Sequence, residues 1–156
     1  MNWNTIASDY LAVADQVFNE LRPAVEKLAE ELTKRLRAGG KVMVCGNGGS
    51  AADAQHIAGE FVNRFLRERR PYAGLALTTD TSVLTAIGND YGYERLFARQ
   101  VEAVGQAGDV LVAISTSGRS PNILKALEVA RAKGLVTVGM TGRGGGQMPA
   151  ACDHVL

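Results

Sequence analysis

The sequence predicts an α/β fold in which a parallel sheet is covered by helices on both faces. Short apolar runs alternate with helical stretches along most of the chain, and each run is continuously apolar. Such strands are typical of a parallel sheet that is buried on both sides. The 156 residues, 46% of them hydrophobic and 21% charged, have the size and composition of one domain, residues 1–156, with a sizeable core.

A helical segment precedes the alternating part. In residues 4–38 apolar side chains recur every three or four positions, Pro23 suits the start of a helix, and Gly39 ends the pattern. Apolar stripes on two helices are more than one sheet face needs, and such surface usually marks an interface. We therefore expect a helical oligomerisation segment at residues 1–38, attached to an α/β core at residues 39–156.

The alternating part contains five expected strands and four expected helical stretches. The strands are expected at residues 41–45, 74–78, 109–115, 135–140 and 153–156. The helices are expected at about residues 51–66, 82–87, 93–104 and 120–133. Ligands of such sheets bind beyond the carboxyl ends of the strands, so the strand-to-loop junctions are the places to look for a site.

Charge and cysteine content narrow the class of protein. The 17 basic and 16 acidic residues give a net charge of +1 and form no long run of one sign, which argues against a nucleic-acid or membrane-surface partner. The first residues lack the order of a signal peptide, and no apolar run approaches the ~20 residues of a membrane span. Two cysteines, Cys45 and Cys152, are typical of a reduced cytosolic protein. We expect a cytoplasmic protein whose partners are small molecules or protein chains.

Four polar junctions follow expected strands. They are GNGGS at 46–50, TTDTS at 78–82, STSGRS at 115–120 and TGRGGG at 141–146. The first matches the dinucleotide pattern G-x-G-x-x-A, yet the next strand ends at Asp80, well beyond the ~20 residues expected for the ribose-binding acid. A nucleotide-triphosphate loop is excluded because the sequence has no G-x-x-x-x-G-K-[ST]. A smaller anion remains as the ligand.

The STSGRS junction carries four hydroxyl groups just before an expected helix. They belong to Ser115, Thr116, Ser117 and Ser120. Hydroxyls and the free N–H groups of a helix N-terminus together form a phosphate cradle. A turn that only caps the helix would have the same spacing, so spacing alone leaves both interpretations open. The GNGGS junction favours the phosphate cradle, because two such loops can hold the two ends of one small sugar phosphate.

Four blocks of the sequence together resemble the sugar isomerase (SIS) domain family, and more narrowly its phosphoheptose isomerases. The blocks are GNGGSAADAQHIAGE, AIGNDYGYERLFARQVEAV, GDVLVAISTSGRSPNI and TGRGGG. The resemblance covers nearly the whole chain. It implies a three-layer sandwich with a central five-stranded parallel sheet of flavodoxin-like type, and a homotetramer with active sites close to subunit boundaries. It also implies conversion of sedoheptulose 7-phosphate to D-glycero-D-manno-heptose 7-phosphate for lipopolysaccharide precursors.

The resemblance assigns roles to individual residues. Substrate contacts are implied for Asn47, Gly48, Gly49, Ser50, Glu60, Asn89, Asp90, Ser115, Thr116, Ser117 and Ser120. The hydroxyls would surround the phosphate, and the Asn89–Asp90 pair would lie near the sugar hydroxyls. His56 and Glu60 correspond to zinc ligands, one ion per subunit. Their i, i+4 spacing puts them on one face of a helix, as it would in an ordinary surface His–Glu pair.

Aldose–ketose isomerisation moves a proton between neighbouring carbons through an enediol, and therefore needs a general base and a group that polarises the carbonyl oxygen. Glu60 is the expected base, and Asp90 is the second choice. A Ser-His-Asp hydrolase is unsupported, because His56 and His154 are the only histidines of the chain.

Members of the family continue past the last expected strand into a C-terminal helix whose glutamine and histidine complete the metal site, whereas this sequence ends at Leu156. His154 lies in CDHVL, which does not match that helix. Two alternatives follow: the chain is shortened, or the protein binds the sugar phosphate and turns it over poorly. The second corresponds to non-catalytic sugar-phosphate-binding or replication-initiator-associating regulatory proteins of the family. A nicotinamide-binding protein is a third, more distant alternative.

Overall fold

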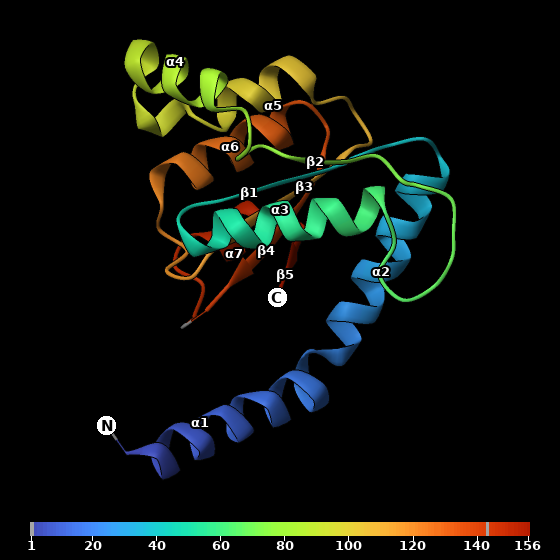
Figure 1. Ribbon diagram of the computed structural model, residues 1–156, viewed down its shortest axis with the longest axis vertical. Helices are drawn as coiled ribbons and strands as arrows, with labels where there is room; N and C mark the ends of the chain where they lie inside the picture. Colours follow the sequence, from blue (N-terminus) through green and yellow to red (C-terminus); the bar gives the residue numbers. More distant parts are fainter. Residues whose placement is uncertain (1, 143) are drawn as a thin grey trace.

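The computed structural model describes residues 2–142 and 144–156, and within these residues five parallel strands form a sheet in the order β2-β1-β3-β4-β5 (Figure 1). The strands are β1 (Val42–Gly46), β2 (Gly74–Ala76), β3 (Val110–Ser115), β4 (Val136–Thr141) and β5 (His154–Val155). The order is that of flavodoxin-like folds, and the expected fold class is confirmed. Arg143 of the TGRGGG junction lies outside the described residues.

Most helices pack around this sheet, and the N-terminal helical segment extends away from it (Figure 1). They are α1 (Trp3–Gln16), α2 (Arg22–Arg37), α3 (Gly49–Val62), α4 (Thr81–Tyr91), α5 (Ala98–Val104), α6 (Pro121–Ala132) and α7 (Met148–Ala151). A π-helical turn, η1 (Val17–Leu21), joins α1 to α2, and a 3-10 turn, η2 (Tyr93–Arg95), precedes α5. The short helix α7 was not expected from the sequence.

One expected helix ends earlier than its apolar pattern indicated. The helix expected at 51–66 stops at Val62, where Asn63 leaves the helical region with φ −90° and ψ −107°. The last carbonyl groups of α3 find partners outside the helix instead. Arg69 donates to the carbonyl oxygens of Glu60 (2.5 Å) and Phe61 (3.0 Å), and the Tyr72 N–H donates to that of Phe61 (3.0 Å).

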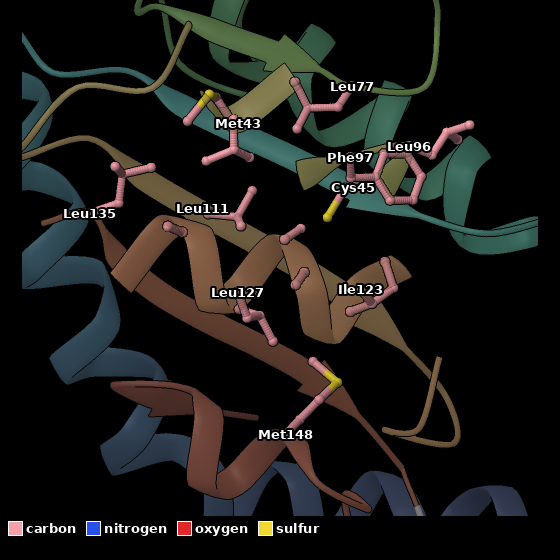
Figure 2. Packing of buried hydrophobic residues seen from close by; sticks show 14 residues of the cluster. Met43, Cys45, Leu77, Leu96, Phe97, Leu111, Ile123, Leu127, Leu135 and Met148 are labelled. Atoms are coloured by element: carbon pink, nitrogen blue, oxygen red, sulfur yellow. The ribbon is translucent and has the colours of Figure 1, made fainter. Parts of the chain in front are cut away.

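The core lies on both faces of the sheet, because successive side chains of a strand point to opposite sides. Met43 and Cys45 of β1 belong to a cluster with α5 and α6, in which Figure 2 labels Leu111 and Leu127. Val42 and Val44 of the same strand belong to a second cluster, which includes residues of α2 and α3. The sheet is thus the middle layer of a three-layer sandwich.

The N-terminal helix α1 projects away from this sandwich (Figure 1). None of its described residues is buried, although several are large and apolar. Trp3 is 77% exposed, Tyr10 72% and Leu11 66%, and Phe18 in the adjoining turn η1 is 74% exposed. No helix among the described residues has both the length and the apolar content to cross a bilayer.

Candidate active site

All four polar junctions leave the carboxyl edge of the sheet, because the strands they follow are parallel. Strand register pairs Gly46 with Ile114 and Ser115 with Thr141, so β1, β3 and β4 end side by side. The GNGGS, STSGRS and TGRGGG junctions therefore start from adjacent positions at the carboxyl edge. The fourth junction, TTDTS, starts α4: Asp80 Oδ1 accepts a hydrogen bond from the Val83 N–H at 2.9 Å, which is an N-cap.

The GNGGS junction turns tightly and leaves open space beside its glycines. A Cβ atom on Gly46 would lie 2.5 Å from the Ser50 carbonyl oxygen, so only glycine lets α3 begin this close to the end of β1. Gly48 has φ +56°, and a Cβ on Gly48 or Gly49 would meet nothing within 4 Å. The exposed backbone at the N-terminus of this 14-residue helix is suited to an oxyanion.

Two hydroxyls of the STSGRS junction face one another. Ser115 Oγ lies 3.2 Å from Ser120 Oγ, and Ser117 Oγ accepts from the Arg119 N–H at 3.3 Å. Ser120 occupies the N-cap of α6, but within the described residues its side chain makes no cap hydrogen bond. The geometry thus favours the phosphate cradle over a turn that only caps the helix, because the Ser120 hydroxyl is not used in capping.

The TGRGGG junction supports the STSGRS junction from behind. Gly118 packs against the backbone of Gly145, and a Cβ on Gly146 would lie 2.5 Å from the Ser117 carbonyl oxygen. The Gln147 N–H donates to the Gly118 carbonyl at 2.9 Å, and the Thr141 hydroxyl donates to the Ser115 carbonyl at 2.8 Å. The glycines of both junctions are therefore needed for this close backbone contact.

A pair of asparagines joins GNGGS to the start of α6. Asn47 Nδ2 donates to Asn122 Oδ1 at 2.9 Å, and Asn122 Nδ2 donates to Asn47 Oδ1 at 2.8 Å. The Tyr93 hydroxyl donates to the same oxygen of Asn47 at 3.0 Å. Asn122 and Tyr93 were not predicted as site residues. A polar side chain directly after Ser-Pro at a helix start was the available signal for Asn122.

The Asn89–Asp90 pair lies in the last turn of α4, where both residues are exposed. Asn89 Nδ2 donates to Asp90 Oδ1 at 2.7 Å. Asp90 also lines a hollow of about 520 Å³ together with Tyr91 and Arg99, whose guanidinium lies 3.8 Å from the Tyr91 ring centroid. Tyr93, three residues after Asp90, connects this segment to Asn47.

His56 and Glu60 share one face of α3, as their spacing predicted. His56 Nε2 lies 3.7 Å from Glu60 Oε1, and the two side chains are 73% and 33% exposed. Glu60 Oε2 is buried and has no hydrogen-bond partner among the described residues. Both residues line a cavity of about 640 Å³ with Ile57, Phe61, Phe65, Leu66, Arg67 and Arg69.

Among the described residues, the lining of the cavity at Glu60 includes none of the serines of STSGRS. Ser50 and Glu60 are ten positions apart in α3, which at 1.5 Å per residue is about 15 Å along the helix. The two parts of the predicted site therefore lie at opposite ends of α3.

Two of the described residues near this cavity, His56 and Glu60, could serve as zinc ligands. His56 and the unpartnered oxygen of Glu60 are suitable zinc ligands, but the described residues contain no group of three or more His, Cys, Asp or Glu side chains that could hold a metal. A catalytic zinc usually has three protein ligands. His56 and Glu60 therefore fit part of such a site.

A flavodoxin-like sheet with glycine-rich and hydroxyl-rich loops at its carboxyl edge is typical of α/β ligand-binding domains, and the family model of the SIS domain matches residues 7–142. The chain belongs to the SIS domain family. Within it, the chain is 58% identical to a phosphoheptose isomerase of Nitratidesulfovibrio vulgaris over 150 residues, covering 96% of this chain and 72% of the relative. It is 62% identical to a phosphoheptose isomerase of Rhodospirillum rubrum over 131 residues, which cover 84% of this chain and 70% of the relative.

Solved structures agree with this placement. The phosphoheptose isomerase of Neisseria gonorrhoeae superimposes with a TM-score of 0.89 at 41% identity, over 97% of this chain and 83% of that chain. A phosphoheptose isomerase of Francisella tularensis superimposes with a TM-score of 0.89 at 38% identity, over 99% of this chain and 85% of that chain. The family resemblance found in the four sequence blocks is confirmed.

Proposed function

We infer that the protein is an aldose–ketose isomerase that converts sedoheptulose 7-phosphate to D-glycero-D-manno-heptose 7-phosphate. The observation that carries this inference is the Ser115–Ser120 hydroxyl pair, which is not used in capping and lies at the sheet edge of a chain 58% identical to a phosphoheptose isomerase. The non-catalytic alternative is not favoured, because the relatives that are 58% and 62% identical to this chain over the aligned residues are both named phosphoheptose isomerase. The product would serve lipopolysaccharide precursors in the cytoplasm.

The serine loop holds the phosphate and leaves the sugar carbons for the rest of the site. Ser115, Ser117 and Ser120 donate to phosphate oxygens, aided by the N-terminus of α6. Thr116, exposed in the same loop, adds a fourth hydroxyl. At the neighbouring loop Asn47, Gly48 and Gly49 contact the sugar, and Ser50 supports them from the first turn of α3.

The reaction itself is a proton transfer between C1 and C2. A base removes a proton from C1 of the ketose, the electron pair forms the C1–C2 double bond, and the C2 oxygen takes up a proton to give the enediol. Return of a proton to C2 and loss of the O1 proton leave the C1 aldehyde. Glu60 is the proposed base, since its Oε2 atom is buried without a hydrogen-bond partner among the described residues. Asp90 is the second choice.

The separation of Glu60 from the serine loop is compatible with this role if the active site lies between subunits. The exposed apolar side chains of α1 and η1 supply an interface, and a homotetramer is the proposed assembly. In it, the cavity at His56 and Glu60 of one subunit would face the serine loop of another. Zinc, when bound by His56 and Glu60 with further ligands, would supply a Lewis acid that polarises the carbonyl oxygen.

Turnover of sedoheptulose 7-phosphate, followed by NMR of the product, tests the proposed function. We expect an aldoheptose 7-phosphate, and no turnover of sedoheptulose that lacks the phosphate. Binding of sedoheptulose 7-phosphate without any turnover would overturn the enzyme assignment in favour of a binding protein.

A further inference from the structure

We propose that Asn122 is a positioning residue that orients the amide of Asn47, so that Asn47 can offer the substrate only a hydrogen-bond donor. The proposal rests on the proposed function, which gives Asn47 its contact with the sugar phosphate. It goes beyond that function because it assigns a role to a buried residue outside the predicted site and states which polarity of group Asn47 recognises.

The contact between the two asparagines is reciprocal and joins distant parts of the chain. Each side-chain amide donates to the oxygen of the other, at 2.9 Å and 2.8 Å, across 75 residues of sequence. Asn122 is only 2% exposed, whereas Asn47 is half-buried at the open side of the GNGGS turn. Asn122 thus lies inside the protein and Asn47 lies between it and the ligand.

The backbone fixes which way both amides point. The Ile123 N–H, which can only donate, lies 3.1 Å from Asn122 Oδ1. The same N–H also donates to the Ser120 carbonyl at 3.1 Å, so Asn122 Oδ1 is its second acceptor. A rotated Asn122 amide would put its NH2 group against this N–H, donor against donor, and the oxygen of Asn122 therefore faces Ile123. The Asn122 NH2 group then faces Asn47, and the oxygen of Asn47 must face it in return.

This orientation leaves Asn47 with one free group, and that group is a donor. Its carbonyl oxygen accepts from Asn122 and from the Tyr93 hydroxyl at 3.0 Å, which fills both acceptor positions. One N–H of its Nδ2 donates to Asn122, and the other has no hydrogen bond within the described residues. The free N–H can bind only an acceptor, which suits an oxygen that gains negative charge as the enediol forms.

A double-mutant cycle on substrate affinity tests the coupling. We expect Asn47→Ala and Asn122→Ala each to weaken calorimetric binding of sedoheptulose 7-phosphate about tenfold, and the double variant to be weakened about tenfold as well, because Asn122 acts through Asn47. Additive losses of about a hundredfold, or no loss in Asn122→Ala, would overturn the proposal. Thr137→Val is the matched control: it removes a buried hydroxyl that bonds Asp153 toward the opposite end of β4, and should leave affinity unchanged.

The orientation can also be measured without substrate, so that failure of the proposed function is distinguishable from failure of this proposal. In NMR spectra of the ligand-free protein, we expect one Nδ2 proton of Asn47 to exchange slowly, and both to exchange fast in Asn122→Ala. An unchanged Asn47 signal would contradict the proposal even if the enzyme is active. Asn122→Ser, which keeps a residue favoured near helix starts, serves as a second variant should the alanine variant fail to fold.

Discussion

Gly118 packs so closely against Gly145 that a Cβ atom on Gly118 would lie 1.8 Å from the Gly145 carbonyl oxygen. The contact joins the STSGRS junction to the TGRGGG junction, and no side chain can be fitted between them. Gly118 also has φ +61°, a conformation that side chains rarely adopt. The shape of the proposed phosphate cradle therefore depends on two backbones in direct contact.

Gly118→Ala should separate these two junctions. Backbone strain alone costs about 1 kcal/mol or more at a positive φ, and the clash adds to it. We expect a lower unfolding midpoint and a loss of sedoheptulose 7-phosphate binding by isothermal calorimetry. Gly39→Ala is the control, since Gly39 has φ +89° but would place its Cβ in open space far from the cradle. If Gly39→Ala weakened binding as much as Gly118→Ala, the close contact would not be the cause.

The paired hydroxyls of Ser115 and Ser120 provide a second test of the cradle. Replacing both by Ala removes two hydrogen bonds to a charged phosphate, each worth ~1.5–3 kcal/mol. We expect the affinity for sedoheptulose 7-phosphate to fall at least a hundredfold, and the fold to be retained. Ser82→Ala in the exposed first turn of α4 should have no effect. Unchanged affinity in the double variant would move the phosphate to another loop.

The sheet could be predicted because its strands are local apolar runs. All five expected strands are present, α2 ends just before Gly39, and α6 begins at Pro121, as these residue types favour. The end of α3 could not be predicted, because Phe65 and Leu66 continue the apolar pattern, while the contacts from Arg69 and Tyr72 that terminate the helix come from later in the chain.

The candidate site was predictable only where its residues lie close together in the sequence. The hydroxyls of STSGRS lie within six residues, so their clustering could be seen in the sequence. The link from Asn47 to Asn122 spans 75 residues and depends on strand order, which no spacing reveals. The roles of His56, Glu60, Asn89 and Asp90 remain predictions, and they depend on how subunits or further ligands complete the site.

The pairing of Lys41 with Asp109 predicts acid sensitivity at the opposite end of the sheet. Burial raises the pKa of the Asp109 carboxyl, but hydrogen bonds from the Lys41 side chain and from the N–H groups of Lys41 and Gln106 outweigh it and hold the pKa below its ordinary value. A carboxyl with a lowered folded pKa stabilises the fold above its unfolded pKa of about 4, and this contribution is lost as the pH falls through the folded value.

Asp109→Asn should therefore reduce the free energy of unfolding by about 1.5–3 kcal/mol at pH 7, measured by urea denaturation. The difference from the parent protein should begin to shrink below about pH 4, where Asp109 of the unfolded chain takes up a proton, and should vanish as the pH falls through the lowered pKa of the folded state. Glu128→Gln, which breaks an exposed pair with Lys125, should change little at either pH. A difference that grew on acidification would contradict the assigned direction of the pKa shift.

The exposed apolar side chains of α1 and of the adjoining turn η1 predict self-association. Leu11 is 66% exposed and Phe18 is 74% exposed in the single chain. If subunits associate through these side chains, a charged side chain at either position would be buried in the interface, which is unfavourable. We expect the protein to be a tetramer by light scattering at micromolar concentration, and Leu11→Glu with Phe18→Glu to dissociate it. Gln16→Glu, a polar change in the same helix, should not. A monomeric parent protein would end this interpretation and the site between subunits with it.

Glu60 is the most direct test of the proposed chemistry. It lies three turns into α3, its Oε2 atom is buried without a hydrogen-bond partner among the described residues, and Arg69 holds its main-chain carbonyl at 2.5 Å. Glu60→Gln keeps the shape of the side chain but removes the base, and loss of a general base typically costs ~10²–10⁴ in rate. We expect turnover to fall by this factor while the calorimetric affinity for sedoheptulose 7-phosphate stays nearly unchanged. Any zinc should bind more weakly, because a carboxylate ligand is gone.

Glu128→Gln is the control and should keep both turnover and affinity. Near-normal turnover in Glu60→Gln would assign the base to Asp90, whereas loss of turnover and affinity together would make Glu60 a residue that shapes the site and not the base.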